Sequence, residues 1–163
     1  MISNCRGSVT GPGFFISDHI LSTVWIMDTS KPVSEIMTRN PVYVRPETGI
    51  DEIHTLFERH SFHHIPVVEH ATLVGIISKT DYVKIRHMLA TTWAGETVCQ
   101  DMYKDMCARD IMSREPLRIE SADTIGLAAD IFRANALHAL PVVDDGELVG
   151  IVTSHDLLTY AYQ

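Results

Sequence analysis

Apolar residues follow two different periods in the first half of the chain. Val42 and Val44 alternate and predict a short strand. Helical spacing follows, at Ile50, Ile53, Leu56 and Phe57. The apolar runs at 65–68 and 73–77 have the length of buried strands, and the four residues between them suit a hairpin. A second helix is predicted to begin near Ser78, so the expected order is strand, helix, strand, strand, helix.

The same pattern occurs twice. Residues 33–83 align with residues 108–158 without a gap, so that Met37 returns as Met112. The second copy has Asp145-Gly146 between its two apolar runs, which favours a hairpin turn because these residues tolerate positive φ. Each unit of a tandem repeat exposes an apolar face that its sibling covers. The two copies therefore predict a module with pseudo-twofold symmetry.

Three motifs recur in order in both copies: I-M-[TS]-x-x-P, H-x-[LI]-P-V-V and L-V-G-I-[IV]-[ST]-x-x-D. Over residues 33–160 this pattern resembles the cystathionine beta-synthase domain pair, also called the Bateman module. The resemblance implies an α+β fold in which tandem β-α-β-β-α repeats pack through their sheets with pseudo-twofold symmetry. It also implies two clefts between the repeats that bind AMP, ADP, ATP or S-adenosylmethionine. The expected divisions are an N-terminal arm at 1–32, repeats at 33–87 and 108–160, and a linker helix region at 88–107.

Asp81 and Asp156 are the residues with the clearest chemistry for such a ligand. Each follows a hydroxyl residue, Ser78 or Thr153, by three positions in the first turn of a predicted helix. An ionised carboxylate can accept hydrogen bonds from both hydroxyls of a ribose. The helix N-terminus attracts an anion such as phosphate. Ribose and phosphate can therefore share one helix start.

A structural explanation of the same residues stays open. A hydroxyl residue followed three positions later by an acid is also a helix cap. The preceding glycines, Gly75 and Gly150, permit a close approach to the strand, which serves either a ligand or packing.

The resemblance assigns each cleft to residues from both repeats. The first cleft is expected to contain Thr38, Tyr43, Phe62, His64, His138, Thr153 and Asp156. The second cleft is expected to contain His63, Ser78, Asp81, Ser113, Arg118, Leu137 and Ala139. The kinase subunit of this family has an arginine after the motif histidine, whereas this chain has His64 and Ala139 there. Contact with phosphate then falls to residues among His63, His138, Arg39, Arg114, Arg118, Lys79 and His155.

The composition of the chain limits the classes of partner that it is expected to bind. The 163 residues include 13 Lys and Arg against 21 Asp and Glu, a formal net charge of -8. Such a chain has no general attraction for a phosphate backbone, so we expect no nucleic-acid partner. The first 27 residues match neither a signal peptide nor a membrane span, so no membrane association is expected. Whether residues 1–26 belong to the native product stays open, with Met27 as the alternative start.

The cysteines and histidines add no disulfide framework and no metal site to this prediction. Cys5, Cys99 and Cys107 are an odd number without zinc spacing, which favours reduced thiols in the cytoplasm. No catalytic motif is present, and we expect no enzyme activity, catalytic residue or cofactor. Histidines cluster at His60, His63, His64 and His70, but neighbours on a strand point to opposite faces, so no metal site is expected.

The sequence therefore predicts a regulatory module. It would bind an adenosine-containing small molecule, form a homodimer and signal to a target protein whose identity the sequence does not give. A ligand-free structural dimerisation module is the first alternative. A redox- or metal-responsive regulator that uses Cys99, Cys107 or the histidines is the second.

Overall fold

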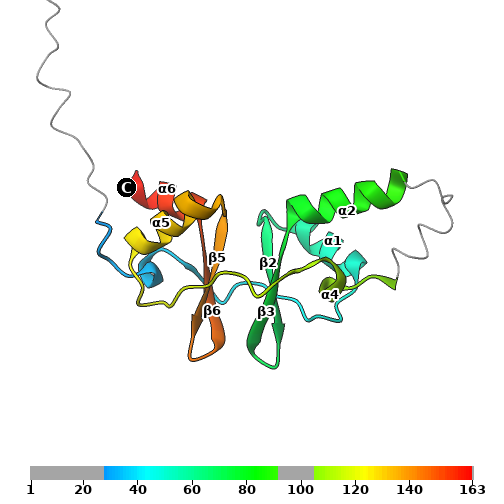
Figure 1. The fold of residues 1–163 in the computed structure, drawn as a ribbon, viewed down its shortest axis with the longest axis horizontal. Coiled ribbons are helices and arrows are strands. Elements are labelled where there is room, and N and C mark those ends of the chain that lie inside the picture. Colours follow the sequence, from blue (N-terminus) through cyan, green and yellow to red (C-terminus); the bar gives the residue numbers. More distant parts are fainter. Residues whose placement is uncertain (1–27, 92–104, 163) are drawn as a thin grey trace, which may run out of the picture.

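The computed structural model describes residues 28–91 and 105–162 (Figure 1). The expected arm lies outside these ranges, apart from residues 28–32. Most of the expected linker helix region, together with Cys5 and Cys99, also lies outside them.

The first repeat has the predicted order of elements. Its elements are α1 (Ile50–Arg59), β2 (His64–Glu69), β3 (Thr72–Ser78) and α2 (Lys79–Thr91). The strand predicted at Val42 and Val44 is reduced to a single parallel bridge, in which Val44 pairs with Val67. Val42 is 43% exposed, whereas Val44 is buried. One residue of this segment therefore takes part in strand pairing.

The second repeat has the same elements at equivalent positions. They are α4 (Ala108–Ile111), β4 (Ser113–Arg114), α5 (Ile125–Asn135), β5 (Ala139–Asp144), β6 (Glu147–Thr153) and α6 (Ser154–Ala161). The first repeat opens with η2 (Val33–Glu35) and β1 (Thr38–Arg39). The parallel bridge recurs as Ile119 with Val142.

The strands form one antiparallel sheet in the order β1-β6-β3-β2, in which β5 also pairs with β6 and β4 with β3. Figure 1 shows the two hairpins, β2-β3 and β5-β6, side by side, with the helices of each repeat at the end away from the hairpin turns. The hairpins meet in the pair Thr72 and Glu147. This mixed helix and sheet architecture agrees with the predicted fold class.

The opening segments of the two repeats are exchanged. β1 pairs with β6, with Arg39 opposite Gly150, and β4 pairs with β3, with Arg114 opposite Gly75. Each repeat therefore contributes a short strand to the hairpin of its sibling. Figure 1 shows the two segments crossing at the middle of the module.

The hydrophobic cores follow the same exchange. The first core is made of α1, β2, β3 and α2, and it also contains Ala108 and Ile111 from the second repeat. The second core contains Val33 and Met37 from the first repeat. Neither repeat completes its core from its own sequence, so we infer that the two fold as one unit.

Glycine is required where the crossing methionines pack. A Cβ on Gly75 would lie 2.5 Å from Sδ of Met112, and one on Gly150 would lie 2.5 Å from Sδ of Met37. These distances are shorter than van der Waals contact. Of the two uses that the sequence left open for these glycines, the structure shows packing between the repeats.

Gly75→Ala should lower the free energy of unfolding by about 1–3 kcal/mol, because the added methyl group overpacks a filled contact. Chemical denaturation would measure the change. Met112→Ala removes most of the overlapping atoms, so Gly75→Ala should cost less in that background. An equal cost in both backgrounds would contradict the assigned contact.

The two hairpin turns have the same conformation with different residues. Asp145 and Gly146 have φ values of 50° and 88°, and their equivalents His70 and Ala71 have φ values of 50° and 70°. A Cβ at Gly146 would meet no atom within 4 Å. There is room for a side chain at this turn position, so alanine and glycine differ here only in the backbone strain that a positive φ causes.

Exchanging these turn residues should move stability in opposite directions. We expect Ala71→Gly to raise the free energy of unfolding, and Gly146→Ala to lower it, by about 0.5–1 kcal/mol each, because glycine adopts positive φ without steric cost. Thermal unfolding of the two variants would check this. A loss of stability in Ala71→Gly would show that the turn is not strained by alanine.

Candidate functional site

The motif aspartate of the second repeat lies at the start of α6. The Oδ2 atom of Asp156 accepts hydrogen bonds from the backbone N–H of Thr153 (2.8 Å) and from its hydroxyl (2.7 Å). The Thr153 hydroxyl in turn accepts from the backbone N–H of Asp156 (3.3 Å). This is a capping box, which satisfies free N–H groups of the helix start. Among the described residues, no group is hydrogen-bonded to Oδ1 of Asp156.

The motif aspartate of the first repeat is engaged through both oxygens. Oδ2 of Asp81 accepts from the Ser78 hydroxyl (2.8 Å), and Oδ1 accepts from Nζ of Lys84 (3.1 Å). The Ser78 hydroxyl and then Lys84 are the main causes that lower the pKa of Asp81, so this carboxyl stays ionised. The two aspartates are therefore not equivalent, because only Asp156 keeps an uncommitted oxygen.

Histidines from both repeats gather beside these helix starts. His64 opens β2 and lies opposite Ser78 in the strand register. Burial is the main cause that lowers the pKa of His64, and the charges of His138 and His63 lower it further, whereas Asp81 raises it. The backbone carbonyls of His63 and His138 accept from Lys79 (2.8 Å) and Ser154 (3.2 Å), the first residues of α2 and α6.

The exchanged strands bring the remaining motif hydroxyls toward these helix starts. Thr38 pairs with Ile151, two residues before Thr153. Ser113 pairs with Ile76, two residues before Ser78. Each helix start is thus bordered by a strand from the other repeat, as the resemblance implied.

Other predicted site residues have surroundings that explain them structurally. Phe62 packs edge-on against Phe57 and stacks on His60. Leu137 packs against the second core, and Ala139 is 7% exposed. Tyr43 is 55% exposed. These side chains take part in packing or face outward.

Sequence reasoning missed a pocket beside the exchanged segment of the second repeat, which contains β4. It has a volume of about 780 Å³ and is lined by Pro46, Glu69, Leu73, Val74, Arg109, Met112, Arg114, Glu115, Pro116 and Arg118. Arg118 was expected in the second cleft, and it lines this pocket. The signal in the sequence was the arginine at 118, where the first repeat has Tyr43.

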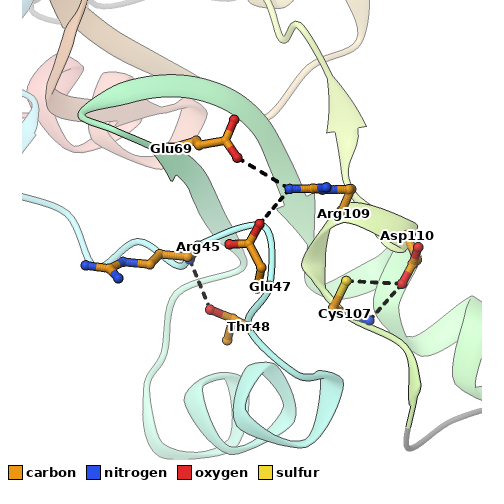
Figure 2. A network of polar contacts seen from close by, with 7 residues as sticks. All are labelled: Arg45, Glu47, Thr48, Glu69, Cys107, Arg109 and Asp110. Atoms are coloured by element: carbon orange, nitrogen blue, oxygen red, sulfur yellow. Dashed lines mark hydrogen bonds and ion pairs between the residues drawn. The ribbon is translucent and has the colours of Figure 1, made fainter.

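An ion-pair network forms one wall of this pocket. Nη2 of Arg109 contacts Oε1 of Glu47 at 2.6 Å and Oε1 of Glu69 at 3.3 Å, so it joins three separate segments (Figure 2). Figure 2 also shows Cys107 turned toward Asp110. The Cys107 thiol and backbone N–H donate to Oδ2 of Asp110 at 3.2 and 2.9 Å, which caps α4 and lowers the pKa of this carboxyl.

Within residues 28–91 and 105–162, no three His, Cys, Asp or Glu side chains are placed to hold a metal ion. No helix in these ranges is long and apolar enough to cross a membrane.

The CBS domain family matches residues 33–87 and 108–162, more than half of the chain. The protein belongs to this family and contains a pair of CBS domains. It is 28% identical over 138 residues to the uncharacterized protein MJ1225 of Methanocaldococcus jannaschii, covering 82% of this chain and 48% of that protein. It is 32% identical over 131 residues to a homoserine O-acetyltransferase of Methanocorpusculum labreanum, covering 79% of this chain and 24% of the enzyme. The chain thus spans half or less of these relatives.

Solved structures of CBS pairs share the fold. CBSX2 in complex with AMP has a TM-score of 0.69 and 27% identity, covering 82% of this chain and 97% of that chain. The CBS domain pair of the protein MJ0100, in complex with 5-methylthioadenosine and S-adenosyl-L-methionine, has a TM-score of 0.63 and 26% identity, covering 78% of this chain and 93% of that chain. CBS pairs similar to this one therefore bind adenosine-containing ligands.

The buried His64 should make stability depend on pH. Its pKa is lower in the folded protein than the ordinary value of 6.5. As pH falls below 6.5, His64 therefore binds a proton more readily in the unfolded chain than in the folded protein. We expect the free energy of unfolding to decrease on going from pH 7.5 toward pH 5, and to decrease less in His64→Gln.

Denaturant titration at several pH values would measure this effect. The control is His155→Gln, which changes an exposed histidine of α6. If His64→Gln and wild type lose stability equally below pH 6.5, His64 is not the group responsible.

Proposed function

We propose that this protein is a regulatory module that binds an adenosine-containing ligand in the clefts between its repeats and signals occupancy to a target protein. AMP, ADP, ATP and S-adenosylmethionine are the candidate ligands. The module acts without catalytic activity of its own, and its compartment is the cytoplasm. The observation that carries this proposal is the carboxylate of Asp156, held at a helix start with Oδ1 uncommitted, beside a strand from the other repeat.

The cleft at Asp156 is the stronger candidate. A ribose needs carboxylate oxygens that can accept from its hydroxyls. Oδ1 of Asp81 already accepts from Lys84, and binding there would require this exposed ion pair to give way. The start of α6 also offers the helix dipole to phosphate. We therefore assign the main site to Thr38, Thr153 and Asp156, with His64 and His138 nearby.

The exchanged strands supply a way to transmit occupancy. A ligand that contacts Thr38 and Asp156 touches both repeats at once. It shifts their relative packing if it binds one arrangement more tightly than the other. Coupling energies of this kind are typically about 1–3 kcal/mol.

A homodimer is the proposed state of the module. Val83 on α2 and Leu158 on α6 occupy equivalent positions and are 50% and 58% exposed. Paired apolar side chains on the two outer helices support self-association through these faces.

The alternative is a ligand-free structural dimerisation module. The capping geometry favours it, because the bonds of Asp81 and Asp156 in this structure are sufficient to explain both residues as helix caps. The two functions differ in what happens when a carboxylate oxygen is replaced by an amide.

Asp156→Asn separates the two roles. Asparagine keeps one oxygen to accept from the Thr153 N–H, but the NH2 group that replaces the other oxygen only donates and cannot accept from a ribose hydroxyl. Hydrogen bonds to a charged group contribute about 1.5–3 kcal/mol, so we expect AMP affinity to fall by roughly tenfold or more. Isothermal titration calorimetry with AMP, ADP, ATP and S-adenosylmethionine would measure it. Asp81→Asn should have a smaller effect.

Asp130→Asn is the matched control, because Asp130 is an exposed aspartate of α5 that pairs with Arg133. It should leave ligand binding unchanged. Folded wild-type protein that binds none of the four ligands at millimolar concentration would rule out the sensor function. Binding that survives both Asp81→Asn and Asp156→Asn would place the ligand elsewhere.

A further inference from the structure

The pocket lined by Arg109, Arg114 and Arg118, here named the arginine pocket, is separate from the proposed nucleotide clefts. Its lining includes Glu69 and Leu73, which border the turn of the β2-β3 hairpin, whereas Ser78 and Asp81 lie at the opposite end of β3. The segment from Ser113 to Arg118 runs between the two places. Arg118 was expected in the second cleft, and Arg114 was among the candidates for phosphate contact in the clefts, but both line this pocket.

The arginines of this pocket are only partly paired. Arg109 is paired with Glu47 and Glu69. Arg114 and Arg118 have no side-chain hydrogen bond or ion pair with any part of the chain that the structure describes. Together with Glu115, the two partners of Arg109 equal the three arginines in number, so the pocket has no excess charge, but two of its guanidinium groups are left unpaired.

The repeat architecture does not require these arginines. The pseudo-twofold equivalents of Arg109 and Arg118 are Ser34 and Tyr43. Arg114 has an arginine, Arg39, as its equivalent, but the guanidinium of Arg39 donates to the backbone carbonyl of Ser34 (3.0 Å). Two of the three arginines therefore belong to one side of the module alone.

We propose that this pocket binds a small phosphorylated molecule that also has an apolar portion. The planar guanidinium groups of Arg114 and Arg118 suit phosphate oxygens, which they can contact through two N–H groups at once. Leu73, Val74 and Met112 provide an apolar wall for the rest of the molecule. The volume of about 780 Å³ lies within the range of small-molecule sites. This site does not depend on the proposed nucleotide clefts.

Pyrophosphate is a suitable probe of the full-length protein. Calorimetry should detect its binding to wild type at millimolar concentration, and Arg114→Gln and Arg118→Gln should each weaken it by roughly tenfold. Arg133→Gln is the matched control, because Arg133 is an exposed arginine of α5 outside this pocket and the proposed clefts, and it should change little. Thermal unfolding of each variant would confirm that the fold is retained.

Three results would overturn the proposal. They are no binding of pyrophosphate to the wild type, binding unchanged in both Arg114→Gln and Arg118→Gln, and an equal loss in Arg133→Gln. Asp81→Asn and Asp156→Asn should leave pyrophosphate affinity unchanged. Pyrophosphate bound at a helix start would lie beside a carboxylate of like charge, so a gain in its affinity in either variant would assign the probe to a cleft and remove the separate site. Failure of AMP binding alone would leave the arginine pocket standing.

Discussion

Two methionines cross between the repeats, and each packs over a glycine in the second hairpin strand of its sibling. Met37 lies on Gly150 and Met112 lies on Gly75, at distances that leave no room for a Cβ. The crossing places the short strands β1 and β4 on the opposite hairpins and completes each core with residues from the other repeat. A single repeat would leave an apolar face uncovered, so the pseudo-twofold arrangement follows from packing.

Local periodicity predicted most of the elements, because their hydrophobic patterns are complete within a few turns or strand residues. Helix α1, both hairpins and the starts of α2 and α6 were predicted in this way. Local periodicity did not predict the exchange, because Ile36 and Met37 lie at the start of their own repeat and nothing in their pattern indicates which core they enter. Only the resemblance, which assigned residues of both repeats to each cleft, pointed to it. At Val42 the local pattern predicted too much. Its alternation with Val44 predicted a strand, but only Val44 forms a bridge.

The candidate site could also be predicted only in part from the sequence. Thr153 and Asp156 could be predicted as a unit because they are three positions apart, within one helical turn. Their two roles could not be separated, because a cap and a ribose contact need the same oxygen atoms at the same spacing. The arginine pocket was missed since its lining comes from distant segments, such as Pro46, Glu69 and Arg114. Recognising it requires the exchanged β4 strand, which only the fold reveals.

The duplication constrains the hydrophobic cores and the exposed surface differently. Core positions and crossing residues have to match in both repeats, because each repeat covers the other. Exposed positions are free to differ, and the charges at Ser34 and Arg109, or at Tyr43 and Arg118, have diverged. The segment that contains Ser113 and Arg118 borders the proposed second cleft at Ser113, opposite Ile76, and lines the arginine pocket at Arg118. The exchange that stabilises the fold thus puts two chemically different surfaces on one shared strand segment.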